Sequence, residues 1–378
     1  MSIIIKLGTV ILNFLYSLLK LLPQKKKVVI ISRQADDPSL DISMLESKFK
    51  ELHPEYETII LCKKIGPGLT GKIKYCFHML TQMYHLATSE IVILDSYCIL
   101  VSLLTHRKSL LVIQMWHSIG TMKKFAYSIL DKPEGSSSKI AYLMKMHKNY
   151  DYILAAGDGY KEHLSQGFNY PLEKIVTLPL PRVEVLKDKA YAQNIKEKVY
   201  SAYPQLNKKE NIVYVPTFRK ANDDEFLVAL KELCDNIDYS KYNLIIKAHP
   251  LTDLSNFNGG LAIIDREFSS FDMLFVADYV VSDYSCIMYE AAVLNKPIYL
   301  YTYDYENYMA TRDIYMDYKK EVPGPICHDS NSLMTAIDEN KYNFNKLKSF
   351  LEKYVYTGSS HETKDIVDFI FTHKKTRC

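Results

Sequence analysis

Four segments of the sequence bring together the side chains that phosphate chemistry uses. Imidazole groups move protons near neutral pH, while guanidinium, ammonium and hydroxyl groups bind phosphate oxygens. The segments are Gln114–Gly120 followed by Lys123 and Lys124, Val215–Arg219, Lys247–Pro250, and Ser282–Ser285 followed by Glu290. We therefore expect a site that binds a phosphate or diphosphate and transfers a proton beside it.

His117 is the residue that we expect to act as a general base. It follows Trp116, the one tryptophan of the chain, and Gly120 and Lys123 come soon after it. A histidine at this place can take the proton of a hydroxyl group. The alternative is a structural histidine that caps the next helix, and it is weaker because a phosphate-binding lysine follows in the same loop. We assign Lys123 and Lys124 to an acceptor or a phosphate.

His249 and Arg219 are the predicted contacts of a phosphate group. His249 precedes Pro250, which biases it towards an extended backbone. We expect its imidazole to donate to a phosphate oxygen and to protonate a departing phosphate. Arg219 has the planar fork that clamps a phosphate with two hydrogen bonds. The alternatives are a loop histidine without a role and a solvated surface charge.

The segment Ser282–Ser285 precedes a predicted helix over 286–294. Serines and free amide groups at a helix start form an anion site, so we expect Ser282 and Ser285 to bind a diphosphate. Asp283 or Ser285 would also cap the helix. Glu290 is either an acceptor for ribose hydroxyl groups or an ordinary solvated charge.

Short apolar runs alternate with helical patterns along the body of the chain. The runs are 28–31, 58–62, 91–94, 110–113 and 152–155, then 212–215, 244–246, 262–264, 279–281 and 298–301. Because they are apolar throughout rather than alternating, they predict parallel strands that are buried on both faces. The segments 41–52, 138–147, 221–234 and 286–294 predict helices. The fold class is therefore α/β, with doubly wound sheets.

The phosphate-binding segments divide between two predicted domains. Each follows a predicted strand, and ligands of open α/β sheets bind at the carboxyl ends of strands. One segment lies in the first half of the chain and three lie in the second, which predicts a cleft between two domains. A charged stretch at 193–211 marks the boundary. We expect an N-terminal helix and basic stretch at 1–27, one Rossmann-like domain at 28–200 and another at 201–378.

The N-terminal residues Ile3 to Leu22 are strongly apolar. The polar residues among them, Lys6, Thr9, Asn13, Ser17 and Lys20, are spaced to form one stripe on a helix. This pattern favours an amphipathic helix that lies in a membrane interface, with lysines among anionic headgroups, and it predicts lipid-facing lysines at 25–27. A spanning helix and a helix packed on its own protein are the alternatives.

The composition excludes several classes of protein. Lys and Arg number 47 against 44 Asp and Glu, and this balance does not predict a nucleic-acid partner. The seven cysteines occur singly, as in a reduced cytosolic protein, and they do not form a zinc-binding pattern. Ser32-Arg33-Gln34 follows the first predicted strand in place of a glycine-rich fingerprint, which argues against a dinucleotide oxidoreductase. We expect no cofactor, and the sequence leaves a requirement for a divalent metal open.

Seven motifs together resemble one known family. They are Q-M-W-H-S-I-G-T-M-K-K-F (114–125), H-K-N-Y-D-Y-I-L (147–154), L-P-R-V (180–183), V-P-T-F-R (215–219), K-A-H-P (247–250), V-S-D-Y-S-C-I-M-Y-E (281–290) and Y-M-D-Y-K-K-E-V-P-G-P-I (315–326). The set is similar to the CDP-glycerol glycerophosphotransferases of wall teichoic acid synthesis. One departure is Ser118, where the family often has a glycine after the histidine.

The resemblance implies a GT-B architecture, with a first domain for the acceptor and a second for the CDP-linked donor. It implies transfer of glycerol phosphate from CDP-glycerol to a polyprenyl-diphosphate-linked acceptor, with release of CMP, at the cytoplasmic face of the cell membrane. The matching base is His117. The matching contacts of the donor phosphates are Arg219, His249, Ser282 and Ser285.

Several alternatives remain open at this point. In the first alternative the donor is CDP-ribitol instead of CDP-glycerol. In the second the protein is a GT-B nucleotide-sugar glycosyltransferase, and in the third it is a non-enzymatic membrane scaffold. The chain has little beyond the pair of catalytic domains, which favours priming or short-chain addition over polymerisation. The sequence also leaves a homo-oligomer open.

Overall fold

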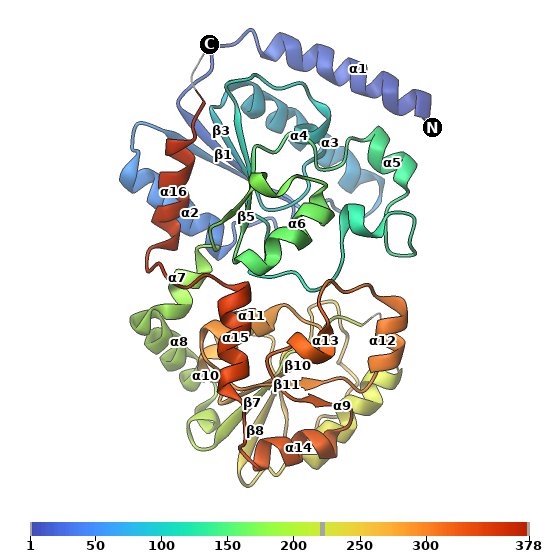
Figure 1. Ribbon diagram of the computed structural model, residues 1–378, viewed down its shortest axis with the longest axis vertical. Helices are drawn as coiled ribbons and strands as arrows, with labels where there is room; N and C mark the ends of the chain where they lie inside the picture. Colours follow the sequence, from blue (N-terminus) through green and yellow to red (C-terminus); the bar gives the residue numbers. More distant parts are fainter. Residues whose placement is uncertain (1, 220–223, 376–378) are drawn as a thin grey trace. The chain divides into compact units, whose positions relative to one another are not determined.

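The computed structural model of the chain describes residues 2–219 and 224–375, which form two compact units (Figure 1). The first unit holds the chain up to Ser118, then Phe125–Arg182, and the described residues from Ser359 onward. The second unit holds Ile119–Lys124 and Val183–Gly358. The chain therefore passes between the units more than once, whereas the sequence led us to expect two contiguous domains.

The first unit is built on a parallel sheet with the strand order β2-β1-β3-β4-β5-β6. The strands are β1 (Lys27–Ser32), β2 (Glu57–Cys62), β3 (Ile91–Leu94), β4 (Leu111–Gln114), β5 (Tyr152–Ala155) and β6 (Ile175–Thr177). All residues of β1, β3 and β4 are buried. Continuous apolar strands of this kind need helices on both faces of the sheet.

Helices surround this sheet (Figure 1). The helices are α1 (Ser2–Leu19), α2 (Leu40–Leu52), α3 (Gly68–Thr88), α4 (Ile99–Leu103), α5 (Ser138–Leu143), α6 (Lys161–Phe168) and α16 (Glu362–Thr372). Short 3₁₀ turns occur at Ala126–Ile129, Asp158–Tyr160 and Leu172–Lys174.

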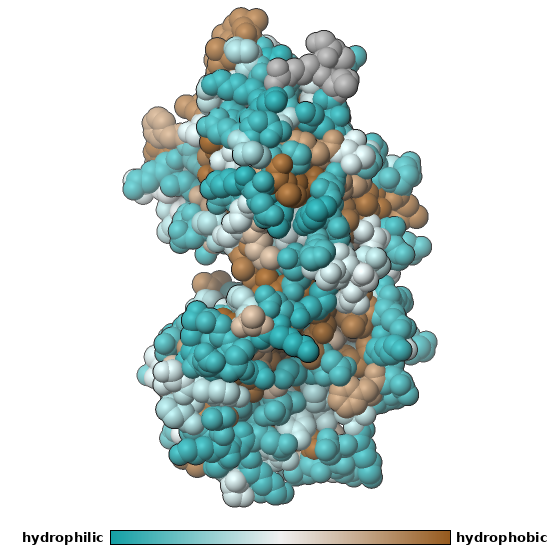
Figure 2. All heavy atoms as spheres, turned by 90° about the vertical axis from the view of Figure 1, so that its left-hand side faces the viewer, coloured by the Kyte–Doolittle hydropathy of each residue, from teal (hydrophilic) through white to brown (hydrophobic). Residues whose placement is uncertain are grey.

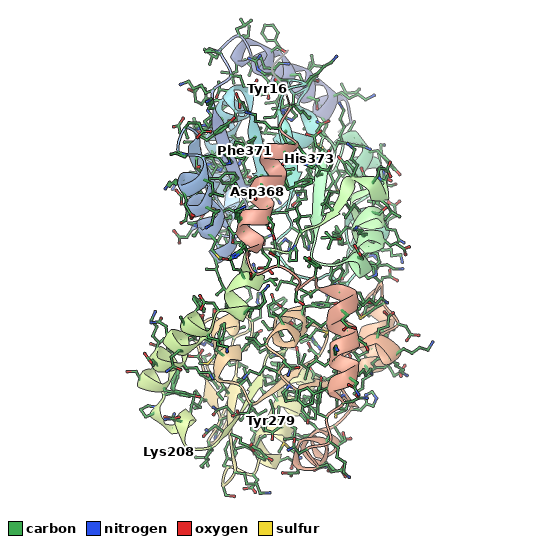
Figure 3. The ribbon with its side chains drawn as sticks, turned by 60° about the vertical axis from the view of Figure 1, so that its left-hand side comes forward. Tyr16, Lys208, Tyr279, Asp368, Phe371 and His373 are labelled. Atoms are coloured by element: carbon green, nitrogen blue, oxygen red, sulfur yellow. The ribbon has the colours of Figure 1, made fainter. Side chains whose placement is uncertain are left out.

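Helix α16 comes from the end of the chain and completes the core of the first unit. Its side chains Ile366, Val367 and Ile370 are fully buried in the same apolar cluster as the central strands. Phe371 stacks on His53, with 3.4 Å between the ring centroids. Figure 3 labels Asp368 and Phe371 on this helix and His373 directly after it.

The second unit repeats the parallel arrangement with the strand order β12-β11-β10-β7-β8-β9. Its strands are β7 (Glu210–Tyr214), β8 (Tyr242–Ile246), β9 (Ile263–Ile264), β10 (Tyr279–Ser282), β11 (Ile298–Tyr301) and β12 (Ile326–Cys327). Its helices are α7 (Arg182–Lys187, of which Arg182 belongs to the first unit), α8 (Lys189–Ala202), α9 (Asp224–Asn236), α10 (Ser270–Val276), α11 (Ile287–Val293), α12 (Tyr305–Thr311), α13 (Tyr318–Glu321), α14 (Ser330–Asp338) and α15 (Phe344–Tyr354), with a 3₁₀ turn at Pro204–Asn207.

The two parallel sheets confirm the predicted α/β class. Each of the ten apolar runs corresponds to a strand. The strands β6 and β12 were not predicted, because runs of three and two residues are too short for a pattern to stand out. The predicted helix 221–234 corresponds to α9, although 221–223 lie outside the described residues.

Helix α1 packs on the first unit through part of its polar stripe. Asn13 donates to the carbonyl of Leu103 and accepts from the amide of Thr105, and the amine of Lys20 donates to the Thr105 carbonyl. The Tyr16 hydroxyl lies 2.9 Å from Nδ1 of His106. The apolar side of α1 is left exposed. Among the described residues, no helix is long and apolar enough to cross a membrane.

The prediction that Lys27 faces lipid is wrong. Its side chain is 1% exposed, because Lys27 is the first residue of the buried strand β1. Its amine donates to the Thr88 hydroxyl at 2.6 Å and lies over the Tyr84 ring. Lys25 and Lys26 are exposed, as a headgroup contact requires.

Candidate active site

The carboxyl edge of the first sheet presents His117 beside the end of β3. Ile31 pairs with Leu94, and Leu94 pairs with Gln114, so the residues after β1, β3 and β4 lie along one edge. Nδ1 of His117 lies 3.1 Å from the backbone carbonyl oxygen of Asp95. A carbonyl only accepts hydrogen bonds, so this contact places the ring proton on Nδ1 and leaves the lone pair on Nε2.

This tautomer suits a general base. Burial lowers the pKa of His117, and the charge of Arg182 lowers it further. The hydrogen bond to the Asp95 carbonyl offsets part of this decrease. The imidazole is therefore neutral at pH 7, with Nε2 able to accept the proton of a hydroxyl group.

An ion pair supports the loop that carries His117. The carboxylate of Asp41, which is 1% exposed, accepts from the backbone N–H of Arg182 and from its Nε, each at 2.8 Å. The Arg182 guanidinium in turn donates to the backbone carbonyl of His117 at 3.3 Å. In the same loop Trp116 has a φ of 65°, a left-handed conformation that non-glycine residues seldom adopt. Because Trp116 rather than Ser118 adopts the left-handed conformation, the turn does not require a glycine at position 118.

The carboxyl edge of the second sheet holds Arg219 in a buried ion-pair cluster. Its guanidinium donates to Asp283 and to Asp304, each at 3.0 Å, and to the backbone carbonyl of Thr217. Burial alone would lower its pKa, but the two carboxylates raise it above its ordinary value. Arg219 is 8% exposed, so it is not a solvated surface charge. Asp283 also accepts from the amide of Thr217, which fixes the loop after β7.

Tyrosines surround this cluster. The Arg219 guanidinium lies 5.1 to 5.8 Å from the ring centroids of Tyr284, Tyr303 and Tyr308. The rings of Tyr284 and Tyr308 are stacked at 3.6 Å, and the Tyr318 hydroxyl donates to the Asp283 carbonyl. These contacts give a structural reason for part of the chain's high tyrosine content.

His249 lines a cavity of about 360 Å³ in the second unit, together with Lys247, Asp265, Phe268 and Ser269. Its Nδ1 accepts from the amide of Leu251 at 3.1 Å, which places the ring proton on Nε2. Burial lowers its pKa. His249 therefore presents a donor where His117 presents an acceptor; the roles of the two residues in a reaction stay predictions.

The other predicted donor contacts are more buried than the sequence suggests. The Ser282 hydroxyl donates to the Val215 carbonyl at 2.8 Å, and Ser285 Oγ accepts weakly from the amide of Ile287 at the start of α11. Glu290 is 4% exposed in α11, so it is not a solvated helix charge. Direct contact of these groups with a nucleotide stays a prediction.

Lys123 and Lys124 belong to the second unit. Residues 119–124 pair with the segment after α12: the amide of Lys124 donates to Asp313, and that of Tyr315 donates to Met122. The amine of Lys123 lies 5.5 Å from the Tyr308 ring centroid, and burial lowers its pKa. Lys123 thereby joins the Arg219 cluster.

Sequence reasoning missed three carboxylates of these edges. Asp304 is the third residue after β11, so inspecting the residues that follow that strand would have found it. Asp95 follows β3 directly. Asp41 had no such signal, because it contacts Arg182 across 141 positions of sequence. Within the described residues, His, Cys, Asp and Glu side chains do not gather into any group that could hold a metal.

Comparison with known families agrees with the motifs. The sequence model of the CDP-glycerol:poly(glycerophosphate) glycerophosphotransferases matches residues 14–372. The chain belongs to this family. The match confirms the resemblance inferred from the seven motifs and extends it to α1 and α16.

Curated relatives of the chain are teichoic acid transferases. A teichoic acid ribitol-phosphate primase of Bacillus spizizenii is 30% identical over 368 residues, which cover 94% of each chain. A teichoic acid glycerol-phosphate primase of Bacillus subtilis is 28% identical and covers 78% of this chain. A poly(ribitol-phosphate) polymerase of Bacillus spizizenii is 29% identical, but the match covers 59% of its length.

Solved structures show the same fold. The wall teichoic acid polymerase TagF, in a histidine-to-asparagine variant soaked with CDPG, has a TM-score of 0.74 at 20% identity and covers 98% of this chain. A UDP-GlcNAc 2-epimerase of Methanocaldococcus jannaschii has a TM-score of 0.58 at 13% identity, with 92% of this chain covered.

Proposed function

We propose that the protein transfers a polyol phosphate from a CDP-activated polyol to a hydroxyl group of a lipid-linked teichoic acid acceptor and releases CMP. The observation that carries this proposal is the contact between Nδ1 of His117 and the Asp95 carbonyl. It occurs in a chain that the family model matches over 14–372. This geometry supports a base whose Nε2 receives the proton of the attacking hydroxyl.

The reaction divides between the two histidines. The acceptor oxygen loses its proton to Nε2 of His117 and attacks the phosphorus that carries the polyol. The bond from that phosphorus to the oxygen of CMP breaks, and Nε2–H of His249 donates to the departing phosphate. The Arg219 cluster keeps the loops after β7 and β10 rigid beside this phosphate, and Lys123 supplies positive charge.

We take CDP-glycerol as the donor, as the description of the family states. CDP-ribitol is the second candidate, because the ribitol-phosphate primase matches this chain over 94% of both lengths. Priming or short-chain addition is favoured over polymerisation, since both primases are covered more completely than the poly(ribitol-phosphate) polymerase.

We also propose that the enzyme binds the cytoplasmic face of the cell membrane through α1 and α3. Exposed apolar side chains line both helices: Ile3, Leu7, Val10, Phe14 and Leu18 on α1, and Leu69, Ile73, Phe77 and Leu80 on α3. The two helices are in contact, and hydrophobic side chains gather at the upper end of Figure 2, where Figure 1 draws α1. Exposed lysines such as Lys6 and Lys72 accompany them, which suits anionic headgroups.

The test is a comparison of donors. The purified protein is incubated with CDP-glycerol, CDP-ribitol or UDP-GlcNAc and a prenyl-diphosphate disaccharide acceptor, with and without a terminal glycerol phosphate, and the product mass and released nucleotide are measured. We expect CMP release and one or a few polyol phosphates on the acceptor. Turnover of UDP-GlcNAc alone, or binding of donors without turnover, would contradict the proposal.

A further inference from the structure

A polar cavity of about 310 Å³ lies at the amino edge of the first sheet, the edge opposite His117. The segments that line it precede β4 and β5, follow α5 or end the described chain. The lining residues that determine its charge and its attachment to α1 are Thr105, His106, Arg107, Lys145, Asp151 and Lys375. The amino and carboxyl ends of parallel strands lie at opposite edges of a sheet, so this cavity is separate from the candidate active site.

Asp151 is the carboxylate that lines this cavity, and both of its oxygens are occupied. One oxygen pairs with the amine of Lys375 at 2.7 Å, and the other accepts from the backbone amide of Val112 at 2.8 Å. The charge of Lys375 is therefore balanced within the cavity. His106 adds no charge, because burial lowers the pKa of its imidazole to about 4.

Arg107 and Lys145 are cations of the cavity that no carboxylate balances. The Arg107 guanidinium donates through Nε and Nη2 to three backbone carbonyls, those of Lys20, Leu22 and Ala87. Its Nη1 takes part in none of these contacts. The Lys145 amine is exposed, and within the part of the chain that the structure describes it forms no ion pair. A guanidinium and an ammonium group at one cavity match the charge and the oxygens of a phosphate.

The loop that carries Lys145 is held in an unusual conformation. Lys145, His147 and Asn149 have φ values of 49°, 57° and 72°, in the left-handed region that non-glycine residues seldom adopt. The side-chain amide of Asn149 donates to the carbonyls of Val101 and Leu104, at 2.8 and 3.1 Å, which holds this loop against the segment that carries Arg107. Strained backbone of this kind persists mostly at binding sites. The loop also contains the H-K-N-Y motif (147–150), which has no part in the candidate active site.

The cavity borders α1, the helix proposed to meet the membrane. Thr105 and His106, which line the cavity, are also residues on which α1 packs. The Asn13 side chain accepts from the amide of Thr105, and the hydroxyl of Tyr16, which Figure 3 labels, lies 2.9 Å from Nδ1 of His106. A helix whose apolar side lies in the acyl boundary keeps its polar side among the headgroups. The cavity, on the polar side of α1, is then at the depth of the headgroup phosphates.

We propose that this cavity binds the headgroup phosphate of an anionic phospholipid of the membrane, through Arg107 and Lys145. The inference rests on the membrane binding proposed above and adds a specific site to it. The apolar side chains of α1 and α3 provide insertion, whereas the cavity selects the headgroup. A bilayer lipid is favoured over a soluble phosphate compound because the exposed apolar helix α1 borders the cavity.

The experiment measures cosedimentation with vesicles of phosphatidylcholine, with and without phosphatidylglycerol. The wild type is compared with K145N, since asparagine suits the left-handed backbone at this position. The matched control K139N removes an exposed lysine of α5 that does not line the cavity. A second arm adds inorganic phosphate, or sodium chloride at the same ionic strength, to the bound protein. Circular dichroism confirms that both variants are folded.

We expect the wild type to bind the vesicles with phosphatidylglycerol more tightly. K145N should weaken this binding roughly ten- to hundredfold, as the loss of a charge-assisted hydrogen bond implies, and leave binding to phosphatidylcholine unchanged. K139N should weaken it no more than about fivefold, the effect of one lysine near an anionic surface. Inorganic phosphate should release the wild type more effectively than chloride, but not K145N.

Equal effects of K145N and K139N, or equal release by phosphate and chloride, would show diffuse attraction and overturn the inference. Release by phosphate without a preference for phosphatidylglycerol would assign the cavity to a soluble phosphate compound and overturn it too. If the wild type binds neither kind of vesicle, the proposed membrane binding itself fails.

Discussion

His117 and His249 are held in opposite tautomers by single backbone contacts. Nδ1 of His117 donates to a carbonyl, and Nδ1 of His249 accepts from an amide. Neither contact needs a carboxylate, so neither ring gains a stabilised positive charge, and burial lowers the pKa of both. Two neutral imidazoles, one accepting and one donating, are what a proton transfer to a base and a hydrogen bond to a leaving group require.

We expect H117A to lose most of its CMP release while the fold is kept. The loss of a general base lowers kcat by roughly a hundred- to ten-thousandfold. Release of CMP from CDP-glycerol in the presence of acceptor measures the effect, and circular dichroism with binding of CDP-glycerol reports the fold. Turnover by H117A at close to the wild-type rate would rule out the assignment of the base.

The acid limb of the pH profile should lie below the ordinary range of histidine. His117 acts as a base only when neutral, and burial lowers its pKa below 6.5. As the pH falls, kcat should therefore stay constant through pH 6.5 and decline only at lower values. A profile of kcat from pH 4.5 to 8 tests this expectation. A decline that begins above pH 7 would assign the limb to another group.

Arg219 should be important for stability as well as activity. Replacing it in R219Q leaves the buried carboxylates of Asp283 and Asp304 unpaired, which typically costs about 3–5 kcal/mol. The thermal midpoint should fall by roughly 10 °C. The control K231Q removes the exposed pair of Lys231 with Asp235 and should cost less than about 1 kcal/mol. An unchanged midpoint with lost donor binding would instead indicate that Arg219 is a phosphate contact alone.

At the scale of elements, helices α1 and α3 form the surface proposed to meet the membrane. Phe14 and Phe77 are 63% and 67% exposed, and a glutamate at either place would bring charge into the acyl boundary. The variant F14E/F77E should lose most of its binding to vesicles with anionic lipids. The control V228E changes an apolar residue of α9 in the second unit that is 58% exposed. Cosedimentation measures both, and equal binding of F14E/F77E and wild type would exclude this surface.

Sequence patterns predict these elements unevenly. A strand such as β3, four buried apolar residues between polar flanks, stands out because its burial on both faces leaves no alternation. The apolar row of α3 was missed because its other face carries apolar residues such as Met83 and Leu86 that pack inside, so the helix has no clean polar side. Site residues directly after a strand were predictable, whereas the Asp41–Arg182 pair depends on tertiary packing.

At the scale of the whole chain, the first unit depends on residues that follow the second. Ile366, Val367 and Ile370 of α16 are fully buried in the core of the first unit. Deleting 359–378 exposes them, at roughly 1.5–3 kcal/mol for each side chain, an amount comparable with the stability of a domain. We expect the truncated protein to lose the first unit. Limited proteolysis with mass detection should show cleavage within 28–182 but protection of 224–358. Equal protection of both would show that α16 is dispensable.

The place of α16 also sets an order of events during synthesis. A ribosome delivers the strands of the first sheet early, yet the helix that closes their core emerges only after the whole second unit. The second unit can finish folding while the first still exposes a strip of its apolar interior. Nascent chains should therefore need chaperones until α16 has been synthesised, and chains that stop before α16 should be degraded rather than accumulate as partly active protein.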